Sequence, residues 1–342
     1  MADPNSGAVL VCGGAGYIAS HVVGALLDAG RTPVVVDDLS TGRRRAVPEG
    51  VALHEASVGD RAALDAVFAA HDIAAVMHFC AHAYVGESVE DPRKYYRNNT
   101  VNALVLLEAM LDHGVGEIVF SSSAAVYGVP DTVPIDETAA IRPINPYGRT
   151  KAIFEQVLAD YGRAYGLRWA ALRYFNAAGA MPDGSIGEDH DPETHLIPLV
   201  LRAALRPAGP GVKVFGTDYD TPDGTCIRDY VHVLDLASAH VRALDYLAAG
   251  EPSAAMNLGT GSGFSVLEII ETCRKVTGVD IPHEAAPRRP GDPPALVARV
   301  DRAHEALGWR AEHSDIETIV ATAWAWHRGH PAGYGRPQTH GR

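Results

Sequence analysis

Short apolar runs alternate with longer amphipathic stretches through the first half of the chain. Short runs bounded by glycine and polar residues are typical of strands buried on both faces, whereas the longer stretches repeat apolar residues at helical spacing. The pattern predicts strands at residues 8–12, 33–36, 51–56, 74–79, 117–121 and 168–174. It predicts helices at residues 17–29, 61–70, 95–113 and 146–165. This alternation indicates an α/β fold built on a doubly wound parallel sheet.

The regular alternation ends after Phe175, and loops rich in proline, glycine and aspartate follow it at 181–195 and 216–225. Three further helices are predicted, at 233–249, 266–276 and 316–328. We expect a first domain over residues 1–175, to which 228–258 returns, a smaller and less regular domain over 176–328, and a polar tail over 329–342.

The composition is that of an ordinary soluble enzyme, since 47% of the 342 residues are hydrophobic and 21% are charged. No apolar run reaches the roughly 18 residues that a membrane-spanning helix needs. The N-terminal segment lacks the basic and apolar regions of a signal peptide. We therefore expect a cytoplasmic protein that does not contact membranes.

The charge and the cysteines exclude several kinds of partner. A net charge of −13 argues against nucleic acid. The cysteines are scattered and form no CxxC pair, so neither disulfides nor a zinc site is expected; they are Cys12, Cys80, Cys226 and Cys273. His190 and His195 flank Asp191, but this spacing matches no HExxH-type site, and no metal is predicted.

A glycine-rich loop, GGAGYIA at 13–19, connects the first predicted strand to the first predicted helix. Gly13 allows a tight turn there, Gly16 lets the backbone approach a pyrophosphate, and the helix N-terminus offers unpaired N–H groups. The second strand leads into Asp37, where a carboxylate suits the ribose hydroxyls of adenosine and repels a 2′-phosphate. The pattern predicts a Rossmann domain that binds NAD in preference to NADP.

A tyrosine and a lysine share one face of the helix predicted from residue 146. Asn145 and Pro146 suit the N-cap and first position of that helix, and Tyr147 and Lys151 lie one turn apart. A phenol has a pKa near 10, and lowering it by about three units takes roughly 4 kcal/mol. The Lys151 ammonium and a positively charged nicotinamide could supply this. With Ser123 bonding the same reacting oxygen, these residues predict a site for proton and hydride transfer.

Seven segments that occur in order along the chain carry a family resemblance: GGAGYIASH, HFCAHAYVGESV, FSSSAAVYG, NPYGRTKAIFEQ, LRYFNAAGA, GTCIRDYVHVLDLA and APRRPGDPPAL. In these segments the chain resembles the UDP-glucose 4-epimerases of the extended short-chain dehydrogenase/reductase group, over about residues 8–328. The resemblance implies an enzyme that keeps its NAD and interconverts UDP-glucose and UDP-galactose through a transient 4-keto sugar. It also implies a homodimer formed through the helices at 95–113 and 146–165.

The resemblance further implies the roles of individual residues. The catalytic residues would be Tyr147, Lys151 and Ser123. The cofactor would be held by these three together with Gly13, Gly16, Tyr17, Ile18, Asp37, Asp38, Ser57, Val58, Phe79, Cys80, Ala81, Asn98, Tyr174 and Phe175. The UDP-sugar would contact Ser123, Tyr147, Asn176, His195, Leu196, Phe215, Arg228, Arg289, Asp292 and Leu296. Among these, Arg228 and Arg289 would bind the pyrophosphate, because guanidinium groups match phosphate oxygens.

Related reactions on the same fold need other side chains. The 4,6-dehydratases that this chain resembles carry an Asp-Glu pair after the serine or threonine, and UDP-glucuronate decarboxylases carry a glutamate there, whereas this chain has Ala124 and Ala125. Leu296 stands where family members admit or exclude an N-acetyl group, so other nucleotide sugars stay open as substrates. Several departures from the family pattern predict weaker NAD retention and leave open a UDP-sugar-binding relative with weakened activity: Cys12, Ala19, Ser57, Ala83 and Ala125.

Overall fold

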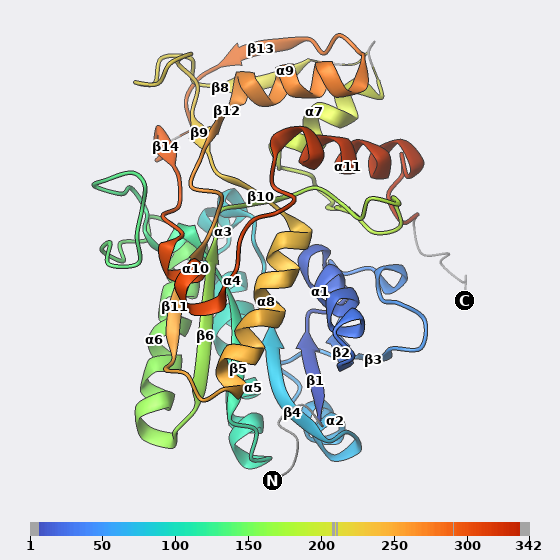
Figure 1. Ribbon diagram of the computed structural model, residues 1–342, viewed down its shortest axis with the longest axis vertical. Helices are drawn as coiled ribbons and strands as arrows, with labels where there is room; N and C mark the ends of the chain where they lie inside the picture. The colour runs from blue at the N-terminus through green and yellow to red at the C-terminus, as the bar shows by residue number, and fades with distance from the viewer. Residues whose placement is uncertain (1–6, 207–208, 210, 290, 336–342) are drawn as a thin grey trace.

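Seven parallel strands form the central sheet, in the order β11-β6-β5-β4-β1-β2-β3 (Figure 1). The computed structural model describes residues 7–206, 209, 211–289 and 291–335. The strands are β1 (Ala8–Cys12), β2 (Thr32–Asp37), β3 (Ala52–Glu55), β4 (Ile73–His78), β5 (Glu117–Ser123), β6 (Arg168–Tyr174) and β11 (Ala254–Leu258). The doubly wound α/β fold predicted from the sequence is confirmed.

Helices cover both faces of this sheet. One face packs on α1 (Tyr17–Asp28), α8 (Val233–Ala248) and α10 (Asp301–Leu307), and the other on α2 (Arg61–Ala70), α5 (Asn102–Asp112) and α6 (Pro146–Tyr165). Alternate residues of β1 enter different cores, because successive side chains of a strand point to opposite faces. Val9 and Val11 join the core under α1 and α8, whereas Leu10 and Cys12 join the other. Burial on both faces explains the continuous apolar runs in the sequence.

A second, smaller layer of structure lies beyond the end of the sheet, at the top of Figure 1. Its core packs three helices together, namely α7 (Leu196–Ala204), α9 (Val266–Thr277) and α11 (Ile316–Gly329). Short strand pairs complete it: β8 (Val212–Phe215) with β13 (His283–Ala286), β7 (Asn176–Ala178) with β10 (Tyr230–His232), and β9 (Ile227–Arg228) between β12 (Phe264–Ser265) and β14 (Ala295–Leu296). The helix α7 was not predicted, and it begins directly after the loop predicted at 181–195.

The helix predicted over 95–113 is present, but it begins earlier and contains a π-helical turn. The segment consists of α4 (Pro92–Tyr96), a π-helical turn η2 (Arg97–Val101) and then α5. Asp91 starts α4 by accepting a hydrogen bond from the Lys94 amide. Several short elements were not predicted, among them α3 (Val85–Glu90), η1 (Arg44–Ala46) and η3 (Ala124–Val126).

The chain returns to the large sheet after the first strands of the smaller layer. The helix α8 packs on α1, and β11 pairs with β6 at the edge of the sheet. The domain boundary at residue 175 stays a prediction. Within the part of the chain that the structure describes, no helix is both long enough and apolar enough to cross a membrane.

The predicted polar tail is folded as far as residue 335. Gly329 ends α11, and Tyr334 is only 8% exposed because its ring packs 4.6 Å from that of Trp326. Arg45 donates a hydrogen bond of 2.8 Å to the Tyr334 carbonyl oxygen. The remainder of the predicted tail, 336–342, and the N-terminal residues 1–6 lie outside the described residues.

Candidate active site

The glycine loop has the close backbone approach that its sequence predicts. Gly13 has a φ of +83°, and a Cβ atom there would lie 2.9 Å from the amide nitrogen of Cys80 at the end of β4. Gly16 is the N-cap of α1 and has no side chain to cap the first turn. The first amides of a helix lack intrahelical acceptors and carry the positive end of its dipole, so they are free to bind a phosphate.

Asp37 both closes this loop and faces the region of the ribose. Its carboxylate accepts hydrogen bonds from the Ala15 amide (3.0 Å) and the Leu39 amide (2.8 Å). Burial raises the pKa of Asp37, and the two amide donors oppose this shift. Asp38 is exposed and accepts bonds from the Ser40 amide and hydroxyl. Of the two predicted carboxylates, Asp37 is therefore the one that is buried and held by backbone amides.

We expect Gly13→Ala to lower both the stability of the protein and its affinity for NAD. The positive φ alone costs a residue with a Cβ about 1–2 kcal/mol, and the methyl group also meets the Cys80 amide. Thermal unfolding and NAD titration measure the two losses separately. Gly30→Ala is the matched control, since Gly30 has a φ of +70° but nothing within 4 Å of its would-be Cβ. If Gly13→Ala binds NAD as tightly as Gly30→Ala does, the close approach is not what requires glycine.

The other predicted cofactor residues lie around the carboxyl ends of the strands. Ile18 follows Tyr17 in α1, and the Tyr17 hydroxyl donates to the Gly179 carbonyl oxygen over 2.6 Å. The Ser57 hydroxyl accepts a bond from the Gly59 amide. The remaining residues are Val58 after β3, the run Phe79, Cys80 and Ala81 after β4, Asn98 in η2, and Tyr174 and Phe175 at the end of β6.

The reacting side chains sit where β5 and α6 approach each other. Ser123 is the last residue of β5, and α6 begins at Pro146 with the Asn145 side chain accepting from the Gly148 amide over 2.8 Å. A Cβ atom at Gly148 would clash with the Ala125 carbonyl oxygen, so glycine lets the helix start close behind Ser123. This places Tyr147, in the first turn of α6, beside the end of β5.

Lys151 is buried beneath the tyrosine and held by the strand. Its Nζ donates a 2.7 Å hydrogen bond to the Ser121 carbonyl oxygen and lies 5.8 Å from the centroid of the Tyr147 ring. Burial lowers the pKa of Lys151 to about 8. The backbone of β5 therefore holds the Lys151 ammonium close to the Tyr147 ring.

The protein alone does not lower the pKa of the Tyr147 phenol, contrary to what a neighbouring lysine suggests. Burial raises this pKa, and the hydrogen bond from Ser123 lowers it by a smaller amount. The positive charge of an oxidised nicotinamide ring is then the remaining source of stabilisation for the phenolate.

A buried polar network behind β5 supports these residues and was not predicted from the sequence. Arg173 and Glu155 form an ion pair whose side chains are 7% and 9% exposed. Glu155 accepts a bond from the Ser122 hydroxyl, and Arg173 donates to the Tyr127 hydroxyl over 2.9 Å. Ser122 is the neighbour of Ser123, so the network fixes the end of the strand that carries it. A glutamate in the middle of an amphipathic helix gives no sequence signal for this role.

Asn99, in the π-helical turn η2, is a second residue that the sequence did not single out. Its side-chain amide donates to the His82 carbonyl oxygen and to Thr150, and its oxygen accepts from the His82 amide. Thr150 is the residue before Lys151. Asn99 therefore ties the loop after β4, where the cofactor is expected, to the catalytic helix.

The predicted substrate residues fall into two groups at the smaller layer. Arg228 forms an ion pair with Asp292, and Leu296 lies opposite Arg228 in the β9–β14 pairing. The Arg289 guanidinium lies 4.2 Å from the centroid of the Phe215 ring. The others lie nearer the large sheet: Asn176 begins β7, His195 is the N-cap of α7, and Leu196 is its first residue.

A family model described as the NAD dependent epimerase/dehydratase family matches residues 9–259, which defines the chain as an NAD-dependent enzyme of this class. The UDP-glucose 4-epimerase of Streptococcus mutans is 52% identical over 96% of this chain and 98% of its own length. The structure of UDP-glucose 4-epimerase from Brucella ovis in complex with NAD is 51% identical, covers 93% of this chain and 98% of that chain, and has a TM-score of 0.90. The one from Bifidobacterium longum in complex with NAD+ and UDP is 41% identical, with 96% and 100% coverage and a TM-score of 0.90. The chain belongs to the UDP-glucose 4-epimerase family, as its motifs indicated.

Proposed function

We propose that this protein interconverts UDP-glucose and UDP-galactose by reversible oxidation and reduction at C4 of the sugar, with NAD as its cofactor. The observation that carries this assignment is the grouping of Ser123, Tyr147 and Lys151 at the end of β5, next to the glycine loop that joins β1 to α1. The family relationship supports the same reaction. The site residues keep the roles that the sequence suggested for them, as proposals.

Tyr147, as a phenolate, accepts the proton of the sugar 4-hydroxyl, while Ser123 hydrogen-bonds the same oxygen. Lys151 favours the phenolate through its positive charge and is itself held by the Ser121 carbonyl oxygen. NAD, when bound beside these residues, would supply the hydride acceptor and then the hydride donor for C4, and the 4-keto sugar would be reduced on its opposite face. Tyr147 then gives its proton back to the C4 oxygen, and the configuration at C4 is inverted.

Inversion requires that the ketone present both of its faces, so the protein must hold the nucleotide firmly and the sugar loosely. Arg228 and Arg289 supply the positive charge for the pyrophosphate in a chain whose net charge is −13. Arg228 is only 9% exposed and is oriented by Asp292. To Phe215, which stacks on Arg289, we assign the contact with uracil.

The neighbours of Ser123 argue against elimination chemistry on this fold. Removing a C5 proton and expelling a hydroxyl group needs a separate acid and base next to the tyrosine. Ala124 and Ala125 occupy the turn η3 directly after Ser123, and neither side chain can exchange a proton. Oxidation and reduction at C4 are the steps that this site can perform.

The residue at position 296 leaves a second class of substrate possible. Leu296 is half-buried and packs against the apolar cluster that contains Ala124 and Ala152, next to the catalytic residues. A leucine there is smaller than a tyrosine and larger than the residues that open such a pocket. UDP-N-acetylhexosamines are therefore one alternative class of substrate, and UDP-pentoses are another.

Conversion of UDP-galactose to UDP-glucose by the purified protein, with and without added NAD, tests the proposal. We expect conversion in both conditions if the cofactor is retained, and a strong dependence on added NAD if Ser57 weakens its binding. UDP-N-acetylgalactosamine is run in parallel, and the ratio of the two rates reports what Leu296 permits. Absence of conversion with saturating NAD would contradict the substrate assignment.

We also propose a homodimer in the cytoplasm. Three valines expose 40–63% of their surface on α3 and η2, near the helices that the resemblance places in the dimer contact: Val85, Val89 and Val101. Leu107, Phe154 and Leu158 do not contribute to the dimer surface, because they are fully buried in the protein's own core.

The proposed cytoplasmic location rests on the cysteines. All four are free thiols, which fits a reducing compartment.

A further inference from the structure

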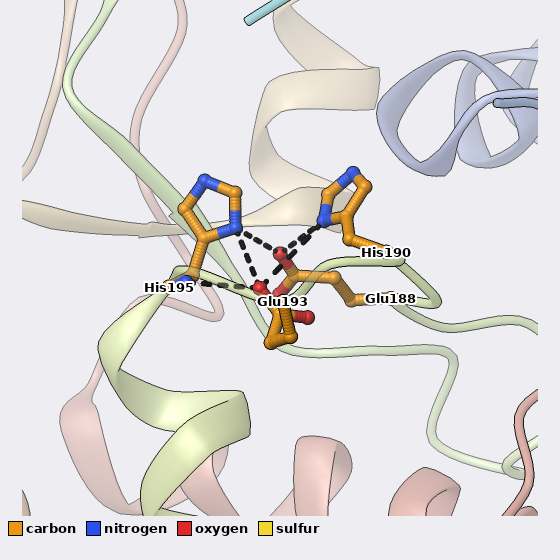
Figure 2. A group of neighbouring side chains, drawn as sticks. All are labelled: Glu188, His190, Glu193 and His195. Carbon is orange, nitrogen blue, oxygen red and sulfur yellow. Dashed lines mark hydrogen bonds and ion pairs between the residues drawn. The ribbon is translucent and has the colours of Figure 1, made fainter. Parts of the chain in front are cut away.

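Four side chains from one loop converge on a single point between the glycine loop and α7. Figure 2 shows Glu188, His190, Glu193 and His195 turned toward one another, with one possible ligand atom of each within 4.8 Å of the others. The His195 Nδ1 lies 2.7 Å from Glu188 Oε1 and 3.0 Å from Glu193 Oε1. The His190 Nδ1 lies 2.9 Å and 3.9 Å from the same two oxygens.

The sequence had indicated no metal here, because His190 and His195 flank Asp191 at a spacing that matches no helical metal motif. In the structure the acids beside the two histidines are Glu188 and Glu193. Asp191 is exposed, whereas the two glutamates further away in sequence turn inward. The loop is irregular until α7 begins at Leu196, so helical spacing does not describe which of its side chains meet.

The carboxylates of Glu188 and Glu193 are both buried, so each needs a positively charged partner. The side chains of Glu188 and Glu193 are 5% and 1% exposed, and a buried carboxylate is costly unless it is paired. Glu193 Oε2 is buried without a hydrogen bond among the described residues, and its nearest cation is Arg202 at 3.6 Å. The two buried carboxylates are thus shared by Arg202 and the rings of His190 and His195.

We propose that Glu188, His190, Glu193 and His195 together bind one divalent cation of the zinc type. Imidazole nitrogen and carboxylate oxygen are donors that Zn²⁺ accepts, and four protein ligands in a compact group give the closed, tetrahedral site of a structural metal. A 2+ ion balances both carboxylates and leaves the histidines neutral.

The position of the site suggests what the ion does. The His190 ring meets the rings of Tyr17 and Tyr84 edge-on, at 6.2 Å and 6.1 Å between centroids, and so borders the cofactor side of the molecule. His195 is the N-cap of α7, and its second ring nitrogen points away from the cluster in Figure 2. The ion would fix the loop between the NAD site and α7 and orient His195, which we assign to the nucleotide.

Metal content and zinc titration test this site without reference to epimerase activity. The full-length protein, produced without a histidine tag, is stripped with a chelator and titrated with ZnCl₂ by calorimetry, in the absence of NAD and UDP-sugar. We expect one Zn²⁺ per chain, and a Co²⁺ adduct with the intense visible absorption of tetrahedral coordination. Glu188→Gln and Glu193→Gln should each weaken Zn²⁺ binding by more than about 100-fold, beyond the loss typical of an outer-shell change. Asp191→Asn is the matched control and should bind as the unmodified protein does.

Thermal unfolding of the unmodified chain gives a second measurement that does not depend on the variants folding. The melting temperature should rise when Zn²⁺ is restored, because an ion that binds only the folded state stabilises it. If the folded, stripped protein takes up no stoichiometric Zn²⁺ or Co²⁺, or if Glu188→Gln binds Zn²⁺ as Asp191→Asn does, the cluster is a metal-free ion-pair network and the proposal is wrong. A failed epimerase assay would leave this result untouched.

Discussion

Tyr147→Phe is expected to reduce the conversion of UDP-galactose by about 10²–10⁴-fold, the range typical for loss of a positioned acid–base group. The substitution removes only the phenolic oxygen, and Tyr147 is the residue of this site placed to exchange a proton with the sugar 4-hydroxyl. The ring and the start of α6 should be unchanged, because Asn145 caps the helix independently. Steady-state rates with saturating NAD, together with the NAD content of the purified variant, measure the effect on chemistry apart from cofactor binding.

Tyr165→Phe, at the other end of α6, is the matched control. Its side chain is on an exposed residue, 63% accessible, and it should leave the rate unchanged. If Tyr147→Phe keeps more than a tenth of the activity while binding NAD normally, Tyr147 is not the proton-transfer residue, and the proposed mechanism fails at its first step.

Arg173→Met is expected to destabilise the protein by about 3–5 kcal/mol, which is typical of removing one partner from a buried ion pair. Glu155 would be left with its charge in the core, bonded only to the Ser122 hydroxyl. Tyr127 would also lose the donor that Arg173 provides, although its own hydroxyl still donates to Asn257. Chemical denaturation, analysed for the free energy of unfolding, measures this loss.

Two further variants serve as controls for Arg173→Met. Arg163→Met breaks an exposed ion pair with Asp160 on the surface of the same helix and should cost less than about 1 kcal/mol. The double variant Glu155→Leu/Arg173→Met removes both charges and should recover much of the stability lost in Arg173→Met. If Arg173→Met is no less stable than Arg163→Met, the buried pair does not support the strand that carries Ser123.

The sequence anticipated the parts of the site that depend on local spacing. Tyr147 and Lys151 are one helical turn apart wherever α6 forms, and Asn145 and Pro146 fix where it begins. Asp37 ends β2, so it lies at the edge of the sheet beside the glycine loop. These relations hold over a few residues, and the apolar pattern alone determines them.

Other features could not be predicted because they join residues far apart in the chain. The Arg228 side chain is paired with Asp292, which is 64 residues away, and Ser122 meets Glu155, which is 33 residues away. The π-helical turn η2 interrupts a segment whose apolar pattern continues as a helix, since Asn99 bonds both the loop after β4 and α6. Neither these long-range pairs nor the π-helical turn changes the local spacing of apolar residues in the sequence.

By itself the sequence determined the α/β order of elements, the glycine loop between β1 and α1 and the one-turn spacing of Tyr147 and Lys151, because these follow from the burial of short apolar strands and from helical spacing. Only the tertiary structure decided which glutamates face His190 and His195, and that Tyr334 is packed on Trp326. In those cases the loop path, not the residue spacing, brings the atoms together. Leaving a charged group buried without a partner costs free energy. The fold that pairs these groups is therefore favoured over folds that leave them unpaired.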